Sequence, residues 1–162
     1  MNKEDQEIVK KLIKELMGKM TFSDFSLEIE DRSGLDEESA IFNIRVSSSD
    51  SSLLIGQQGA TLKALQYILR VMARRRSQEK LRFLVDVNDY RKQKVESLAE
   101  LAENVAKEVI EEKRPIVLRP MSAYERRIIH MKLAGNGKVE TGSIGEGEDR
   151  RVVVKPLRET LA

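Results

Sequence analysis

Two glycines, Gly56 and Gly59, bracket a pair of glutamines in the first half of this 162-residue chain. An apolar segment precedes the glycines, and a long amphipathic helical pattern follows them. Because glycine has no Cβ, its backbone can form a tight turn and come close to a large ligand. Exposed N–H groups in such a turn, beside a helix N-terminus, favour phosphate. The pair therefore predicts two helices joined by a phosphate-binding turn.

The sequence around this turn predicts a complete α/β unit. Apolar residues recur at helical spacing in some segments and alternate as in strands in others. The predicted order is helix, strand, strand, single helical turn, helix and strand, over residues 3–18, 25–29, 41–46, 47–52, 60–76 and 82–87. The polar segment 31–39 is expected to be a loop between the two first strands.

A second α/β unit is predicted from residue 90 onward. It begins with a long helix that Pro115 ends, followed by a short strand, a second helix and a hairpin. The predicted bounds are residues 90–112, 116–118, 121–134, 139–144 and 150–155. Because no flexible linker separates the two units, we expect them to pack rigidly.

The second helix of this unit carries Arg126 and His130, which lie four residues apart and so share one helical face. We expect Tyr124, Ile128 and Met131 to pack inward and the Arg–His pair to point outward. Metal binding by His130 is disfavoured, because it is the only histidine and the chain has no cysteine. A nucleic-acid contact is favoured for His130, and a structural hydrogen bond is the alternative.

Positive charge gathers where these motifs lie. Residues 39–94 carry a net charge of +7 and residues 113–162 a net charge of +5, whereas the segments 1–38 and 95–112 each carry −5. In the predicted helix 60–76, Lys63, Arg70 and Arg74 lie on one side and form a cationic stripe that begins at the glycine turn. This segregation indicates an anionic partner such as nucleic acid; an ordinary solvated helix face is the alternative.

The ordered pair of motifs resembles the bacterial Jag/KhpB family of RNA-binding proteins, in which a KH domain precedes an Arg-x-x-x-His domain. The resemblance covers roughly residues 33–158, and the phrase that ends Tyr-Glu-Arg-Arg-Ile-Ile-His is its most specific part. It implies an α+β fold with a type II KH-like domain packed against an Arg-x-x-x-His domain. The expected parts are an N-terminal helix and first strand (1–32), the KH core (33–89) and the Arg-x-x-x-His domain (90–158). Many members carry an N-terminal Jag domain, which this sequence is expected to lack.

Together with the cationic stripe, the resemblance gives the candidate residues for binding nucleic acid; for Ile55, core packing is the alternative. The candidates are Ile55, Gly56, Gln57, Gln58, Gly59, Lys63, Arg70, Arg74, Arg126 and His130. Family members usually carry a basic residue between the two glycines, whereas this chain has two glutamines there. Amide side chains and backbone N–H groups can still bind phosphate or base edges.

The function expected from these features is non-enzymatic binding of single-stranded RNA in the cytoplasm. The chain shows no phosphate-binding P-loop, no dinucleotide fingerprint and no nucleophile motif, so we expect no catalysis and no cofactor. We also expect no membrane insertion. The family implies a post-transcriptional or cell-envelope regulatory role and a small KH-only protein partner. The alternatives are a protein–protein adaptor with a vestigial glycine loop and a single-stranded DNA binder.

Overall fold

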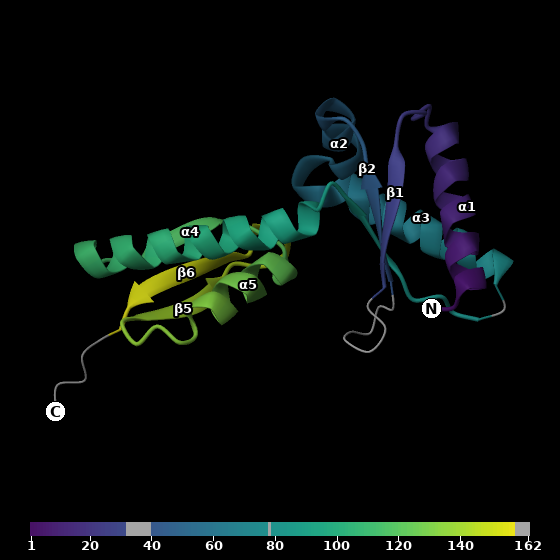
Figure 1. The fold of residues 1–162 in the computed structure, drawn as a ribbon. Helices are drawn as coiled ribbons and strands as arrows, with labels where there is room; N and C mark the ends of the chain where they lie inside the picture. The colour runs from purple at the N-terminus through teal and green to yellow at the C-terminus, as the bar shows by residue number, and fades with distance from the viewer. Residues whose placement is uncertain (32–39, 78, 158–162) are drawn as a thin grey trace. The chain divides into compact units, whose positions relative to one another are not determined.

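The computed structural model describes residues 1–31, 40–77 and 79–157, and the chain divides into two compact units, Met1–Tyr90 and Arg91–Ala162 (Figure 1). Most of the loop predicted at residues 31–39, and the domain boundary predicted within it, lie outside the described residues. Among the described helices, none has the length and apolar character needed to cross a membrane. Rigid packing of the two units stays a prediction.

The described residues of the first unit form a three-stranded sheet and three α-helices. Its elements are α1 (Lys3–Lys19), β1 (Ser26–Asp31), β2 (Ala40–Arg45), α2 (Ser48–Ile55), a 3-10 turn η1 (Gln57–Gly59), α3 (Ala60–Arg76) and β3 (Leu84–Val87). The strand order is β1-β2-β3, in which β1 and β2 are antiparallel and β2 and β3 are parallel. Parallel neighbours need a crossover connection, and α2 and α3 provide it.

The predicted element order of this unit is confirmed, with one difference in length. The serine-rich segment forms the eight-residue helix α2 instead of a single turn. Ser47 caps it, because its hydroxyl accepts a hydrogen bond from the backbone N–H of Asp50 at 3.2 Å. Leu54 is buried and draws the last turn of α2 onto the core.

The core of the first unit lies between the sheet and helices α1 and α3. Leu62, Leu65 and Leu69 of α3 are buried against it, as their spacing predicted. Phe42 of β2 and Phe83 pack edge to face, with ring centroids 5.9 Å apart. This packing determines which side of α3 remains in solvent.

A buried amide fastens α3 to the backbone beside it. Gln66 donates from its Nε2 to the carbonyl oxygen of Phe83 at 3.2 Å, and its Oε1 accepts from the N–H of Val85 at 2.7 Å. Arg70, one turn further along, also donates to the carbonyl of Phe83, at 3.3 Å. These bonds satisfy backbone groups at the edge of the sheet, where β3 has one strand neighbour among the described residues.

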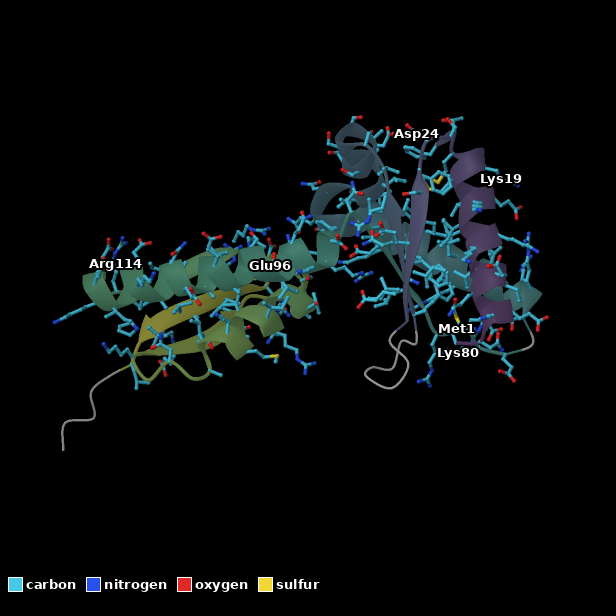
Figure 2. All side chains as sticks on the ribbon, in the orientation of Figure 1. Met1, Lys19, Asp24, Lys80, Glu96 and Arg114 are labelled. Atoms are coloured by element: carbon cyan, nitrogen blue, oxygen red, sulfur yellow. The ribbon has the colours of Figure 1, made fainter. Side chains whose placement is uncertain are left out.

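The second unit packs two helices on an antiparallel sheet. Its elements are α4 (Tyr90–Glu112), β4 (Ile116–Pro120), α5 (Ala123–Leu133), β5 (Val139–Ile144), a 3-10 turn η2 (Gly147–Asp149) and β6 (Arg151–Pro156). The strand order is β4-β6-β5, and β5 and β6 form the predicted hairpin. Apolar residues of α4 and α5 share one core with this sheet. Arg114, just beyond the end of α4 (Figure 2), forms ion pairs with Glu108 and Glu112.

The predicted inward face of α5 is wrong. Ile129 and Leu133 are the buried apolar residues of this helix, whereas Tyr124 and Met131 are 59% and 66% exposed. Ile128 packs only partly against the core. The cause is that α5 also buries Glu125, one turn before Ile129 on the same side, so that the inward face contains a carboxylate that apolar patterning does not select.

Gln66→Ala is expected to lower the free energy of unfolding by about 2–3 kcal/mol, because it removes the buried amide that accepts from the N–H of Val85 and donates to the carbonyl of Phe83. Urea unfolding measures this loss. The control is Gln57→Ala, which truncates an exposed glutamine and should change stability by less than about 0.5 kcal/mol. Equal stability of the two variants would contradict a structural role for Gln66.

Candidate nucleic-acid interface

The turn between α2 and α3 depends on the backbone conformation of its two glycines. Gly56 has φ +69° and Gly59 has φ +81°, a region that other residues rarely adopt. A Cβ on Gly56 would clash with Oγ1 of Thr61, and a Cβ on Gly59 would lie 3.1 Å from the ring of Tyr90. Glycine at these two positions therefore allows the backbone to turn sharply between α2 and α3 while it packs closely against Thr61 and Tyr90.

The residues between the glycines face solvent. Gln57 and Gln58 are both exposed, and Gln58 also has a positive φ, +53°. Ile55, just before the turn, is half-buried and packs against the core. Ile55 therefore anchors the start of the turn to the core, and part of its side chain remains exposed. The turn offers two amide side chains and its backbone to a ligand.

Helix α3 begins directly after this turn and carries the cationic stripe. Its first turn contains no acidic residue, so no carboxylate there offsets the partial positive charge at the N-terminus of the helix. Lys63, Arg70 and Arg74 are exposed on one flank of the helix, beside the face that buries the leucines. The structure thus places the glycine turn and the stripe on one continuous element, as the sequence predicted.

In the second unit, His130 is held by two hydroxyl groups of β5. Its Nδ1 lies 2.7 Å from Oγ1 of Thr141, and its Nε2 lies 3.1 Å from Oγ of Ser143. The side chain is half-buried. Burial, followed by the positive charge of Arg126, lowers the pKa of His130 below its usual range. A neutral imidazole is consistent with two hydroxyl partners, since one ring nitrogen donates and the other accepts.

Arg126 is also half-buried, and its Nη1 donates to the carbonyl oxygen of Met121 at 2.7 Å. The expectation that Arg126 and His130 simply point outward is therefore wrong. Their helical positions border the buried face of α5, so each side chain bonds to its own unit while part of it remains exposed. The structural alternative for His130 is realised through side-chain hydroxyls, and a nucleic-acid contact stays a prediction.

Glu125 is the buried charge that orients α5. Its Oε2 accepts hydrogen bonds from the N–H and hydroxyl of Ser122, both at 2.8 Å, which completes a capping box. Its Oε1 lies 3.0 Å from Nζ of Lys94 on α4. Burial raises the pKa of Glu125, but the bonds from Ser122 and Lys94 outweigh it and hold the pKa below its usual range. Lys94 therefore provides the positive charge that balances the buried carboxylate of Glu125.

Comparison with known proteins assigns both units. The family model described as "KhpA/KhpB, KH domain" matches residues 6–85, and the model of the domain named for its Arg-x-x-x-His motif matches residues 96–156. The chain is 38% identical over 117 residues to the RNA-binding protein KhpB of Clostridium symbiosum, covering 72% of this chain and 53% of that protein. It is 34% identical over 126 residues to the KhpB of Bacillus subtilis, covering 76% and 61%. The chain belongs to the KhpB family.

This membership confirms the predicted α+β fold, in which a KH domain is followed by an Arg-x-x-x-His domain. A third relative, the KhpB of Lactiplantibacillus plantarum, is 37% identical over 111 residues, which cover 68% of this chain and 34% of that protein. The chain therefore spans between a third and about three fifths of the length of these relatives. All three are named as RNA-binding proteins, and none is named as an enzyme.

The sequence interpretation missed two residues of the site around His130. Thr141 and Ser143 alternate along β5 and so face the same side of the sheet as His130. Their period-two spacing was visible, but nothing in it indicated which helix would lie over them. No group of three or more metal-ligating side chains occurs within the part of the chain that the structure describes.

Gly56→Ala is expected to destabilise the KH domain by about 1–3 kcal/mol, because a Cβ is strained at this φ and approaches Thr61. Thermal unfolding measures the change. Gly18→Ala is the matched control, since a Cβ there meets no atom within 4 Å and alanine favours the helix. Equal melting of the Gly56→Ala variant and the wild type would refute the constraint.

His130 is expected to make stability depend on pH in the window that begins near pH 6.5, the usual pKa of a histidine side chain, and extends to lower pH. Its pKa is lower in the folded protein than in the unfolded chain. Its contribution to the free energy of unfolding is therefore complete at a pH above the pKa of the unfolded chain, and it declines as the pH falls towards the pKa of the folded protein. Melting curves across this window test it, because the chain has no other histidine. His130→Gln should flatten the dependence, and an unchanged profile in that variant would contradict the assignment.

Proposed function

We propose that this chain binds single-stranded RNA through two surfaces, the glycine turn with the exposed face of α3 in the KH domain, and the Arg126–His130 face of the Arg-x-x-x-His domain. The observation that carries the proposal is the exposed Gln57–Gln58 turn, held by two positive-φ glycines at the start of a helix with a cationic face. Backbone N–H groups and the helix N-terminus suit a phosphate, and a KH loop clamps about four nucleotides.

In the Arg-x-x-x-His domain, the two residues have different expected roles. Arg126 has one N–H bonded to Met121, and a guanidinium has five N–H donors. It can bind a phosphate or stack on a base. Both ring nitrogens of His130 are engaged by hydroxyls, so the ring is expected to meet RNA through its exposed surface, with Thr141 and Ser143 as positioning residues.

We further propose a cytoplasmic, non-catalytic role in post-transcriptional or cell-envelope regulation. The support is family membership, since the curated relatives are named as RNA-binding proteins. A small KH-only protein is the proposed partner. The matching model for the first domain describes both KhpA and KhpB, so a related KH domain is a reasonable candidate for joint binding.

The decisive experiment replaces both loop glutamines by aspartate. Gln57→Asp with Gln58→Asp places two negative charges in the proposed phosphate path, at exposed positions where aspartate tolerates the backbone. We expect at least about a tenfold loss of affinity for single-stranded RNA, measured by fluorescence anisotropy, without a change in melting. The matched control, Gln57→Asn with Gln58→Asn, keeps the amides and should bind like the wild type.

The same assay separates the alternatives. If the double-aspartate variant binds RNA with the affinity of the wild type, the glycine-loop clamp is excluded. If the wild type binds no nucleic acid, the protein–protein adaptor is favoured. Equal or tighter affinity for single-stranded DNA of the same sequence would favour the DNA-binding alternative. Gln57→Lys should tighten RNA binding and steepen the salt dependence by about 0.7 in logarithmic slope, the value for one added phosphate contact on a single strand.

A further inference from the structure

A hollow of about 380 Å³ lies beside the C-terminal half of α3, away from the glycine turn. Four cationic side chains line it, Arg70 and Arg74 from α3, and Lys80 and Arg82 from the segment that leads to β3, in which Figure 2 labels Lys80. Tyr67 forms part of the wall, and the other lining residues are apolar. The volume lies within the range of about 300–1,000 Å³ found for small-ligand sites.

Helical geometry places the α3 side of this hollow on one stripe. Three lining residues follow Tyr67 by three, four and seven positions along α3, namely Arg70, Val71 and Arg74. At these spacings the four side chains are neighbours on the helix surface. Arg70 is held in position by its bond to the carbonyl oxygen of Phe83. The wall of the hollow is thus supported by a rigid helix and by the backbone just before β3.

Tyr67 contributes little to the core of the KH domain. Its side chain is 70% exposed, and it is absent from the residues that form or border the core. No hydrogen bond of its hydroxyl group is found within the described residues. An exposed aromatic ring surrounded by cations offers what a nucleotide needs, a flat surface for the base and positive charge for the phosphate.

The lining residues restrict the class of ligand. The described residues that line the hollow include four cationic groups and no carboxylate, which favours an anion over a cation as the ligand. Tyr67 follows Gly59 by eight residues, about 12 Å along the helix axis. Lys63 is exposed on the helix between them. A strand held at the glycine turn can therefore continue along α3 to the hollow.

We propose that this hollow is a second nucleotide subsite of the KH domain, in which an unpaired base of the bound RNA stacks on Tyr67 and its phosphate is bound by the surrounding cations. The inference rests on the proposed function, because the nucleotide belongs to the strand that passes the glycine turn. It adds Tyr67, Lys80 and Arg82 to the binding residues and predicts a longer footprint than the turn alone provides.

Tyr67→Ala tests the subsite with two single-stranded oligonucleotides, one of about four nucleotides, the length clamped by a KH loop, and one about three times as long. The longer RNA should lose about five- to a hundredfold in affinity, the range for removal of one stacked base, and the shorter RNA at the turn should change by less than about twofold. Tyr67→Phe keeps the ring and should retain the affinity of the wild type. Melting should not change, because Tyr67 is exposed.

A second pair of variants tests the cations. Arg74 lines the hollow, whereas the adjacent exposed Arg75 does not. Arg74→Gln should weaken binding of the longer RNA and flatten its salt dependence more than Arg75→Gln, although both remove one positive charge from the same turn of α3. Equal effects of the two variants would indicate general electrostatic attraction and overturn a built subsite.

The outcomes distinguish this inference from the function on which it rests. If the wild type binds RNA and the Tyr67→Ala variant binds each oligonucleotide with the affinity of the wild type, the subsite is refuted and the proposed function stands. If the wild type binds no RNA, the proposed function itself fails. Saturation of the hollow by a free nucleoside monophosphate at micromolar concentration, dependent on Tyr67, would assign it to a free nucleotide. A changed oligomeric state of Tyr67→Ala in sedimentation would assign it to a protein interface. Either result overturns the RNA-strand subsite.

Discussion

The packing of α3 on the sheet of the KH domain is the constraint on which the first candidate surface depends. Leu62, Leu65 and Leu69 bury one side of the helix, and Gln66 binds the backbone on both sides of Leu84. Rotation of α3 by one residue, about 100°, would break both amide bonds and expose the leucines. The opposite side is thereby held in solvent, with the glycine turn at its start and the hollow beside Tyr67 near its end.

The Arg-x-x-x-His domain depends on a different kind of constraint, a buried carboxylate. Glu125 caps the start of α5 through Ser122 and reaches Lys94 on α4. Because it is buried with Ile129 and Leu133, it determines the rotation of α5 over the sheet. That rotation places His130 over the hydroxyls of Thr141 and Ser143. A charge inside the domain is tolerated here because Oε2 accepts two hydrogen bonds from Ser122 and Oε1 lies 3.0 Å from the ammonium group of Lys94.

The two candidate surfaces are consequently built from different groups. The glycine turn uses backbone conformation, and its two glutamines project into solvent with no charge of their own. The Arg126–His130 surface uses side chains that are already bonded within the domain, which restricts the orientations of both residues. Restricted side chains lose less conformational entropy when a ligand binds. The first surface can adapt to a strand, whereas the second presents a preformed arrangement.

Local sequence patterns determined most of the secondary structure, because helix and strand periods, caps and glycine positions are properties of neighbouring residues. The bounds of α3 and α4 and of the β5–β6 hairpin follow from such patterns, and so does the conformation of the turn at Gly56 and Gly59. The ordered pair of motifs also determined the family. Only the tertiary structure decided which side of α5 is buried, since Glu125 becomes an inward residue only when Lys94 from another helix meets it. It likewise decided that Thr141 and Ser143 bind His130. It also decided that Lys80 and Arg82 line one hollow together with Tyr67. These contacts join residues whose separation in the sequence carries no periodic signal.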